Sequence, residues 1–168
     1  IVPESIASRA PPDAALLAAI IDLNARYVRV VDDGPLDAWP DFFTDECVYR
    51  IQPRENFDRG LPLATLSFES RGMLMDRVYS VRETLFHDPY YQRHVVGTPI
   101  VRRVDADGRI HSEANYAVFR TRLSKESTVF NVGRTIDEVV RTPQGLKFAS
   151  RIVVYDSEMI PNSLIYRI

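Results

Sequence analysis

Cysteine is almost absent from this chain, with Cys47 the only one among 168 residues. A single cysteine excludes an internal disulfide and any cysteine cluster for zinc or an iron–sulfur centre. It also fits a reducing compartment, so we expect a cytoplasmic location. The net charge of the chain is also small, formally −2 at pH 7. We therefore expect neither nucleic acid nor an anionic membrane as a partner.

Long apolar runs and the common catalytic motifs are missing too. The longest apolar run, "AALLAAII", covers residues 14–21, far short of the ~20 residues that cross a bilayer. We see no basic segment followed by an apolar one, the pattern of a secretory signal. The motifs G-x-S-x-G, G-x-x-x-x-G-K-[ST] and G-x-G-x-x-G do not occur. The sequence therefore offers no motif for nucleophilic catalysis or for phosphate binding.

The beginning of the chain predicts an arm followed by a helix. Residues 1–12 carry three prolines and predict a flexible arm, while residues 13–168 have the length of one domain. Apolar residues recur at spacings of three and four over 16–31, which predicts a helix. Asp13 is placed to cap this helix and Gly34 to end it.

A second helix and several short elements follow. Apolar spacing predicts a helix over residues 71–85, with Ser70 as its cap and Pro89 beyond its end. The segments before it are predicted as helical turns carrying core aromatic residues (35–46), a strand (47–53), a loop (54–64) and an ambiguous stretch (65–70).

The second half of the chain predicts a sheet. Its four segments rich in β-branched and aromatic residues are 94–104, 109–123, 128–141 and 146–156. Short turn sequences join them, so the strands should be antiparallel neighbours in chain order. A strand of ~14 residues would be ~45 Å long, so the sheet must curl, and Gly97, Pro99 and Gly133 lie where bends would allow it. The prediction is an α+β fold, a curved antiparallel sheet wrapped on N-terminal helices as a cone with a cavity at its mouth.

The segment "HDPYYQRH" (87–94) concentrates polar and aromatic side chains. His87, Asp88 and His94 are the residue types of a two-histidine, one-carboxylate iron site. However, the two histidines lie on either side of a proline, and no regular element aims them at one point. We therefore favour a joint between helix and strand at an interface or at the rim of the cone. Tyr90, Tyr91 and Arg93 are its predicted interface residues.

An acid–base pocket inside the cone is the alternative. A histidine with a carboxylate moves protons, and a tyrosine polarises a carbonyl. His94, Asp41 and Tyr49 are the catalytic candidates of this alternative. Further residues that could face inward are Tyr27, Arg93, Arg151 and Asp156. The spacing does not force these residues together, and the simpler interpretation of each is a hydrogen-bonded core or rim residue.

Arginines and an apolar C-terminal stretch complete the candidates. The arginines in predicted strands are Arg120, Arg122, Arg134 and Arg151, interleaved with Tyr116, Phe119 and Phe130. Such a strip could bind single-stranded nucleic acid. Carboxylates on the same sheet would neutralise it, namely Glu113, Asp137, Glu138 and Asp156. We therefore favour a salt-bridged surface or a subunit interface. The stretch 159–168 should dock on its own sheet or on a partner, which makes Ile165 and Tyr166 predicted interface residues.

Four stretches together resemble one family. They are "DAWPDFFTDECVYRIQPRENFDRGLPL" (37–63), "DRVYSVRETLFHDPYYQRHVVGTP" (76–99), "NYAVFRTR" (115–122) and "SRIVVYDSEMIPNSLIYRI" (150–168). The chain resembles the small (beta) subunit of Rieske-type aromatic-ring-hydroxylating oxygenases, most of all the salicylate-hydroxylating members. The resemblance implies the cone fold of the nuclear transport factor two superfamily.

The resemblance also implies partners and cofactors. It implies a non-catalytic, structural subunit that forms a trimer within an alpha3beta3 assembly with three large (alpha) subunits. The large subunit would carry the Rieske [2Fe-2S] cluster and the mononuclear iron. A Rieske cluster needs two cysteines and two histidines, and this chain has one cysteine, so we expect no cofactor here and assign no catalytic residue from the family. The alternative is a stand-alone dehydratase, isomerase or cyclase of the same fold.

Overall fold

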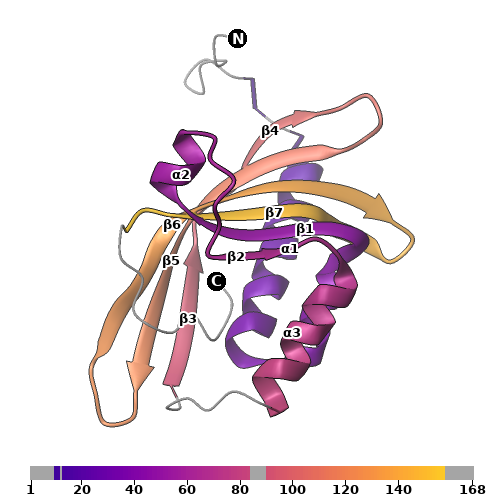
Figure 1. Ribbon diagram of the computed structural model, residues 1–168. Helices are drawn as coiled ribbons and strands as arrows, with labels where there is room; N and C mark the ends of the chain where they lie inside the picture. Colours follow the sequence, from indigo (N-terminus) through magenta and orange to yellow (C-terminus); the bar gives the residue numbers. More distant parts are fainter. Residues whose placement is uncertain (1–9, 12, 84–89, 158–168) are drawn as a thin grey trace.

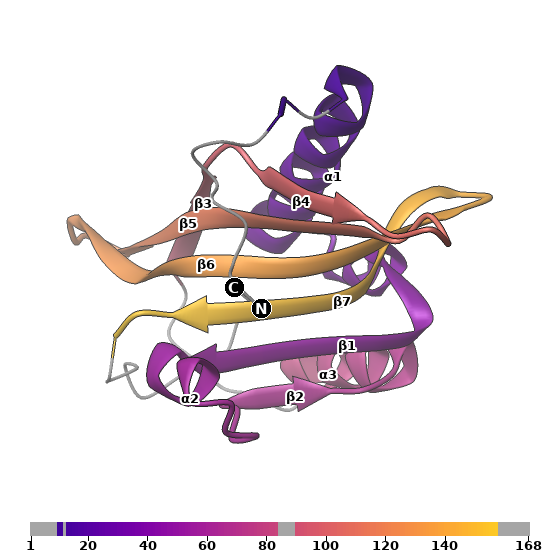
Figure 2. The same ribbon diagram turned by 90° about the horizontal axis from the view of Figure 1, so that it is seen from above.

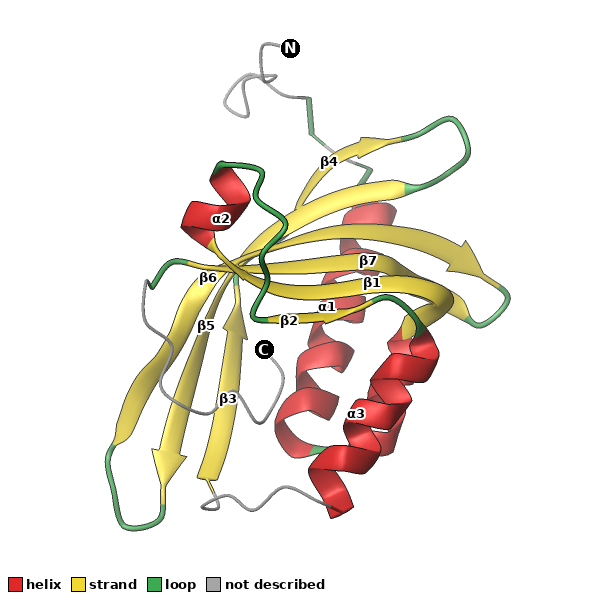
Figure 3. Ribbon diagram, in the orientation of Figure 1, coloured by secondary structure: helices red, strands yellow, loops and turns green. Residues whose placement is uncertain are grey.

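The computed structural model describes residues 10–11, 13–83 and 90–157. Their two long helices pack on one side of a strongly twisted sheet, which confirms the α+β class (Figure 1; Figure 3 separates helices from strands). The helices are α1 (Ala14–Asp33), the 3₁₀ helix η2 (Leu36–Phe42), α2 (Arg54–Asp58) and α3 (Arg71–Glu83). The strands are β1 (Phe43–Pro53), β2 (Leu66–Phe68), β3 (Tyr90–Val96), β4 (Ile100–Val104), β5 (Ile110–Arg122), β6 (Ser127–Thr142) and β7 (Gly145–Tyr155).

The first long helix begins and ends where its caps predict. The Asp13 side chain accepts a hydrogen bond from the Ala15 amide at 2.9 Å. At the other end, Gly34 has a φ of 77° and its amide donates to the Val30 carbonyl. Glycine adopts this backbone conformation without the steric penalty of a Cβ atom. The buried face of α1 consists of Ile20, Leu23, Asn24, Tyr27 and Val31.

The elements after α1 match the predictions with two corrections. Residues 43–46, predicted as part of the helical turns, form the start of strand β1. The Ser70 hydroxyl accepts a hydrogen bond from the Met73 amide at 3.2 Å and caps α3 as expected. The predicted loop 54–64 is wrong at its start, because residues 54–58 form the short helix α2. Its ion pairs at i,i+4, Arg54 with Asp58 and Arg59 with Glu55, are typical of a helix surface. The expected arm over residues 1–12 and the end of α3 near Pro89 fall largely outside the described residues.

The sheet is antiparallel through its last strands but mixed as a whole. Its strand order is β2-β1-β7-β6-β5-β3, with β4 also paired to β5 (Figure 2). The hairpins predicted for the second half are confirmed, since β5, β6 and β7 pair antiparallel in chain order. The expectation of a wholly antiparallel sheet needs correction, because β1 runs parallel to β7, with Tyr49 opposite Arg151. Turn sequences predict only the pairing of strands that follow each other in the chain, whereas β1 and β7 lie far apart in the sequence.

The two glycines expected at bends mark an interruption between strands and a close approach of two strands. The predicted strand 94–104 is interrupted between β3 and β4, and both parts pair with β5 on either side of its middle. Gly97 lies in this interruption. At Gly133 the backbone of β7 comes so close that an added Cβ would lie 1.9 Å from the Val154 carbonyl oxygen. We call β3 with residues 116–122 of β5 and 127–132 of β6 the wing, since this part of the sheet extends away from α3 (Figure 1).

Candidate functional site

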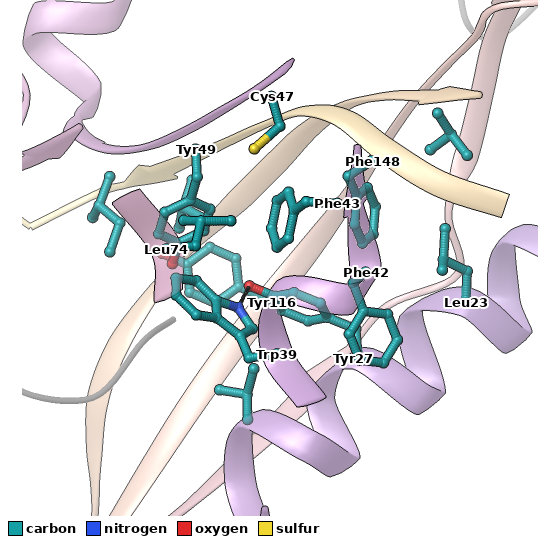
Figure 4. Packing of buried hydrophobic residues seen from close by; sticks show 14 of the residues in the cluster. Leu23, Tyr27, Trp39, Phe42, Phe43, Cys47, Tyr49, Leu74, Tyr116 and Phe148 are labelled. Carbon is teal, nitrogen blue, oxygen red and sulfur yellow. Dashed lines mark hydrogen bonds between the residues drawn. The ribbon is translucent and has the colours of Figure 1, made fainter. Parts of the chain in front are cut away.

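Aromatic side chains fill the space between the helices and the sheet, where a cone fold could hold a ligand (Figure 4). The Tyr27 ring makes edge contacts with Phe42 and Phe148, with centroids 5.5 Å apart in both pairs. Trp39 meets Tyr49 at 5.3 Å, and its indole N–H donates to the Tyr27 hydroxyl at 3.0 Å. These edge-to-face contacts are favourable packing geometries. The inward-facing tyrosines of the alternative pocket are therefore part of the core.

The three candidates of that pocket each have a different partner. Tyr49 is fully buried and stacks on Phe68. The Asp41 carboxylate pairs with Arg71 at the surface, beside a groove of about 690 Å³ between α1, η2, α3 and the β6–β7 hairpin. His94 pairs with Asp32, a residue that the sequence pattern did not single out. The structure thus shows no contact that joins His94, Asp41 and Tyr49.

Two neighbouring aspartates at the end of α1 hold two neighbouring residues of β3. Asp32 takes the buried position, where its carboxylate accepts from the His94 amide at 2.8 Å and lies 2.6 Å from His94 Nδ1. The side chains of His94 and Asp32 are only 3% and 2% exposed. Asp33 takes the outer position and accepts two hydrogen bonds from Arg93 at 2.7 and 3.1 Å. We call this arrangement the double clamp.

The ion pair between Arg93 and Asp33 shifts the pKa of both groups toward their charged forms. The hydrogen bonds from the Arg93 guanidinium hold the pKa of the Asp33 carboxyl below its usual range, and Arg29 adds to the effect. The same contact raises the pKa of Arg93. In the inner pair, His94 Nε2 is buried without a hydrogen-bond partner among the described residues. The contact at 2.6 Å places a proton on Nδ1, donated to Asp32.

A second buried polar cluster lies between α1 and the sheet. The Arg151 guanidinium donates to both carboxylate oxygens of Asp137 at 3.1 Å and to the Asn24 side chain at 2.8 Å. It also lies over the rings of Tyr27 and Phe148, 4.3 and 4.2 Å from their centroids. Burial raises the pKa of Asp137 to about 6, although the hydrogen bonds from Arg151 oppose this shift. Arg151 therefore anchors β7 to α1 through Nε and Nη2, while its buried Nη1 has no hydrogen-bond partner among the described residues.

The metal reading of "HDPYYQRH" finds no support in the described part of the chain. Residues 13–83 and 90–157 contain no group of three or more histidine, cysteine or carboxylate side chains placed to hold an ion. His87 and Asp88 lie outside the described residues. His94 is bound to Asp32, and His111 pairs with Asp105 at 2.7 Å. Cys47 is buried, which raises the pKa of its thiol, as expected for a small core residue.

The predicted arginine strip divides into two groups. Arg134 and Arg151 form ion pairs with Asp58 and Asp137. Arg120 and Arg122, at the far end of β5, have no ion pair with any described residue, since they do not approach a carboxylate within 4.0 Å there. Arg134 fits the predicted salt-bridged surface, whereas Arg151 pairs inside the core, and Arg120 and Arg122 belong to the end of the wing.

The predicted interface residues of β3 lie on an edge strand of the sheet. Tyr91 is 77% exposed and points to the side of the wing away from α1, whereas Gln92 and His94 are buried on the α1 side. Tyr90 lies under the Arg120 guanidinium at 5.5 Å. The apolar residues exposed on the same side as Tyr91 occupy adjacent positions of three strands and form what we call the outer patch: Tyr91, Val95, Phe119, Val129 and Val132. Ile165 and Tyr166 lie outside the described residues.

Sequence reasoning missed Asp32 and Asn24, and it named Asp137 only as one of the carboxylates that neutralise the arginine strip. A usable signal existed for Asp137, because it occupies an inward position of a strand whose inward neighbours Thr135 and Val139 are also buried. A carboxylate in such a row requires a buried cation, and Arg151 is the residue opposite it on β7. For Asp32 the doubled aspartate at a helix end was visible, but its partner is 62 positions away in the chain.

Comparison with known proteins agrees with the fold. The SnoaL-like domain family matches residues 12–152. The chain is 39% identical over 143 residues to the anthranilate 1,2-dioxygenase small subunit of Burkholderia cepacia, covering 84% of this chain and 88% of the relative. It is 31% identical over 138 residues to subunit beta 1 of the terminal oxygenase component of terephthalate 1,2-dioxygenase from Comamonas sp., covering 82% and 89%.

Solved structures give the same assignment. A beta subunit assigned to an aromatic-ring-hydroxylating dioxygenase of Novosphingobium aromaticivorans superimposes with a TM-score of 0.81 at 35% identity, covering 90% of this chain and 95% of that one. The beta subunit of benzoate 1,2-dioxygenase from Burkholderia mallei shares the fold, with a TM-score of 0.73 at 18% identity and coverage of 95% and 100%. The chain belongs to the SnoaL-like domain family and, within it, to the small (beta) subunits of aromatic-ring-hydroxylating dioxygenases.

Proposed function

We propose that this chain is the non-catalytic, structural subunit of a cytoplasmic ring-hydroxylating oxygenase. The single observation that carries the proposal is the aromatic packing between the helices and the sheet within the described residues. An enzyme of this fold needs a pocket that places acid–base groups around a substrate, whereas here the candidate Tyr49 and its neighbours are packed ring against ring. The two buried polar clusters join α1 to β3 and to β7, so they fix the scaffold.

The cofactors belong, in this proposal, to the large subunit. The Rieske [2Fe-2S] cluster and the mononuclear iron would be bound there, since the single cysteine of this chain cannot supply the ligands of the cluster. The substrate is proposed to be an aromatic carboxylic acid such as a salicylate-like acid. Two relatives support this class by name, because anthranilate and terephthalate are both aromatic carboxylates.

For the assembly we propose a ring of three copies. A closed head-to-tail ring needs two different surfaces on each copy. One is the outer patch of the wing, which contains no carboxylate. The other is the exposed stripe of Met75 and Tyr79 on α3, two residues at i,i+4 beside the buried face of that helix. The occupant proposed for the outer patch is therefore the α3 stripe of a neighbouring copy.

Co-expression with the large subunit tests the function. We expect a coloured complex that contains iron and oxidises an aromatic carboxylate, while this chain alone is colourless and inactive. His94→Ala should leave the iron content of the assembled complex unchanged. Turnover by the isolated chain that is lost in His94→Ala would instead establish the stand-alone enzyme and refute the proposal.

Two single variants test the ring. Val129→Asp in the outer patch and Met75→Asp in the α3 stripe should each lower the mass of the chain measured by light scattering. Mixing the two variants should restore one intact interface, between the stripe of the first and the patch of the second, and give a dimer but no ring. A full ring in either variant, or no association in the mixture, would contradict the head-to-tail arrangement. Arg141→Asp, outside both surfaces, serves as the control.

A further inference from the structure

Most of the described arginines form ion pairs with carboxylates, so the cations that do not form one are candidates for binding a partner. Along the sheet the carboxylates that could neutralise a basic strip have partners of their own. Glu113 pairs with Arg102, Glu138 with Arg109, Asp137 with Arg151 and Asp156 with Arg54. Arg120, Arg122 and Lys125 have no ion pair among the described residues. Three cations without a described ion pair therefore lie together at the far end of the wing, and two others, Arg141 and Lys147, lie on the β6–β7 hairpin.

These three cations line one groove. It has a volume of about 470 Å³ and is bounded by Arg120, Arg122, Lys125, Glu126 and Thr128. Arg120 and Arg122 are two residues apart on β5 and therefore project from the same side of the strand. Phe119 projects from the other side, into the outer patch. The groove, which we call the basic groove, and the outer patch therefore lie on opposite sides of the wing.

Aromatic rings hold one of the cations in place. The Arg120 guanidinium lies over Phe130 at 4.7 Å and over Tyr90 at 5.5 Å from the ring centroids. Such contacts fix the plane of the guanidinium while its N–H groups stay free to donate at the edge. A guanidinium has five donors and no acceptor, so a ligand that satisfies it must bring acceptor oxygens, best a carboxylate bound through two oxygens.

The size and surroundings of the groove favour a protein ligand. Nucleic acid requires a charged track that follows many phosphates, but beyond the groove the carboxylates of the sheet are interleaved with the arginines. Glu126, itself at the groove, lowers the net positive charge that a densely charged anion would meet. One or two acidic side chains on a peptide segment match three cations and one carboxylate.

We propose that the basic groove binds an acidic segment of the large subunit, through carboxylates placed against Arg120, Arg122 and Lys125. This inference rests on the proposed function, since it assigns the partner of that assembly to a particular surface. The wing then contacts two partners, a neighbouring copy through the outer patch and a large subunit through the basic groove.

The test compares two double variants with equal changes in charge. Arg122→Glu with Lys125→Glu reverses two exposed cations of the groove, while Arg141→Glu with Lys147→Glu reverses two other cations without a described ion pair. Binding of the chain to its large subunit is measured at low and at high salt. We expect the groove variant to bind at least about ten-fold more weakly at low salt and to lose most of the salt dependence. The control variant should bind within about two-fold of the wild type.

Each other outcome has a separate meaning. Equal binding of the groove variant and the wild type would overturn the proposal while the proposed function stands. A reduced mass of the groove variant alone would assign the groove to a second copy of this chain, and a reduced unfolding temperature would assign it to another part of the same chain. Either result overturns the proposal. Failure of the wild type to bind the large subunit would instead refute the proposed function.

Discussion

The double clamp contains two adjacent aspartates, Asp32 and Asp33, whose contributions to the stability of the protein can be compared. Asp32→Asn changes the buried carboxylate that accepts from the His94 amide and from Nδ1–H. The amide of asparagine has one acceptor oxygen and one donor group, so one of the two contacts is lost and a buried N–H of His94 faces another donor. Hydrogen bonds to a charged group contribute about 1.5–3 kcal/mol, and an unsatisfied buried donor adds to the loss. We expect the free energy of unfolding to fall by about 3 kcal/mol.

Urea unfolding followed by tryptophan fluorescence measures this change, since Trp39 lies in the core. With a slope of about 2 kcal/mol/M, a loss of about 3 kcal/mol lowers the midpoint by roughly 1.5 M. The control is Asp33→Asn, which removes the outer carboxylate from Arg93 and Arg29. Exposed ion pairs contribute little, so its midpoint should move only slightly. A midpoint shift for Asp32→Asn no larger than that of the control would refute the reasoning.

A double variant separates the contact from general disruption. Asp32→Asn together with His94→Asn should destabilise the protein by less than the sum of the two single changes, because both single changes break the same contact. If the losses in unfolding free energy of the two single variants simply add up in the double variant, Asp32 and His94 act independently. The contact between them would then contribute nothing to the stability of the protein.

Further predictions concern three sites inside the domain. Gly133→Ala should lower the free energy of unfolding by about 3 kcal/mol or more, since its Cβ would overlap the backbone of Val154. In the control Gly97→Ala the nearest atom to the new Cβ is 3.6 Å away, so the urea midpoint should change little. Equal shifts of the urea midpoint in the two variants would contradict this prediction. Cys47, which is 2% exposed, should react with a thiol reagent only after unfolding, so rapid labelling of the native protein in the absence of urea would be inconsistent with the buried core. Because burial raises the pKa of Asp137 to about 6, above the value of about 3.9 in an unfolded chain, the native state binds the extra proton. The stability that Asp137 contributes is therefore complete below pH 4 and is lost as the pH rises through 6. Carbon NMR should show the Asp137 carboxyl titrating near pH 6, and a titration midpoint below pH 4 would contradict the raised pKa.

The local elements followed from local signals. Asp13, Gly34 and the apolar spacing between them predicted α1, because capping and amphipathic periodicity act over a few residues. Gly97 and Gly133 predicted bends, since only a residue without a side chain fits where strands cross closely. The parallel pairing of β1 with β7 was not predictable in this way, because no turn joins the two strands.

The candidate site was harder to predict than the fold for the same reason. Tyr49 and His94 were plausible catalytic residues while their neighbours were unknown, and the structure gives them Trp39 and Asp32. A residue's chemistry depends on what surrounds it, and those contacts come from distant parts of the chain. Tyr91 and Arg93 do lie on an edge strand of the described sheet, and their role at an interface stays a prediction.

The position of β7 has a consequence for synthesis of the protein. Within the described residues, β7 is the strand that joins β1 and β2 to β6, β5 and β3, with hydrogen bonds on both of its edges. On the ribosome, β1 emerges long before β7, so two exposed strand edges must wait for it. Premature termination before Gly145 leaves both groups of strands without the partner between them. Such a truncated chain should therefore accumulate as aggregate, and the sheet closes only when nearly all of the described chain has been made.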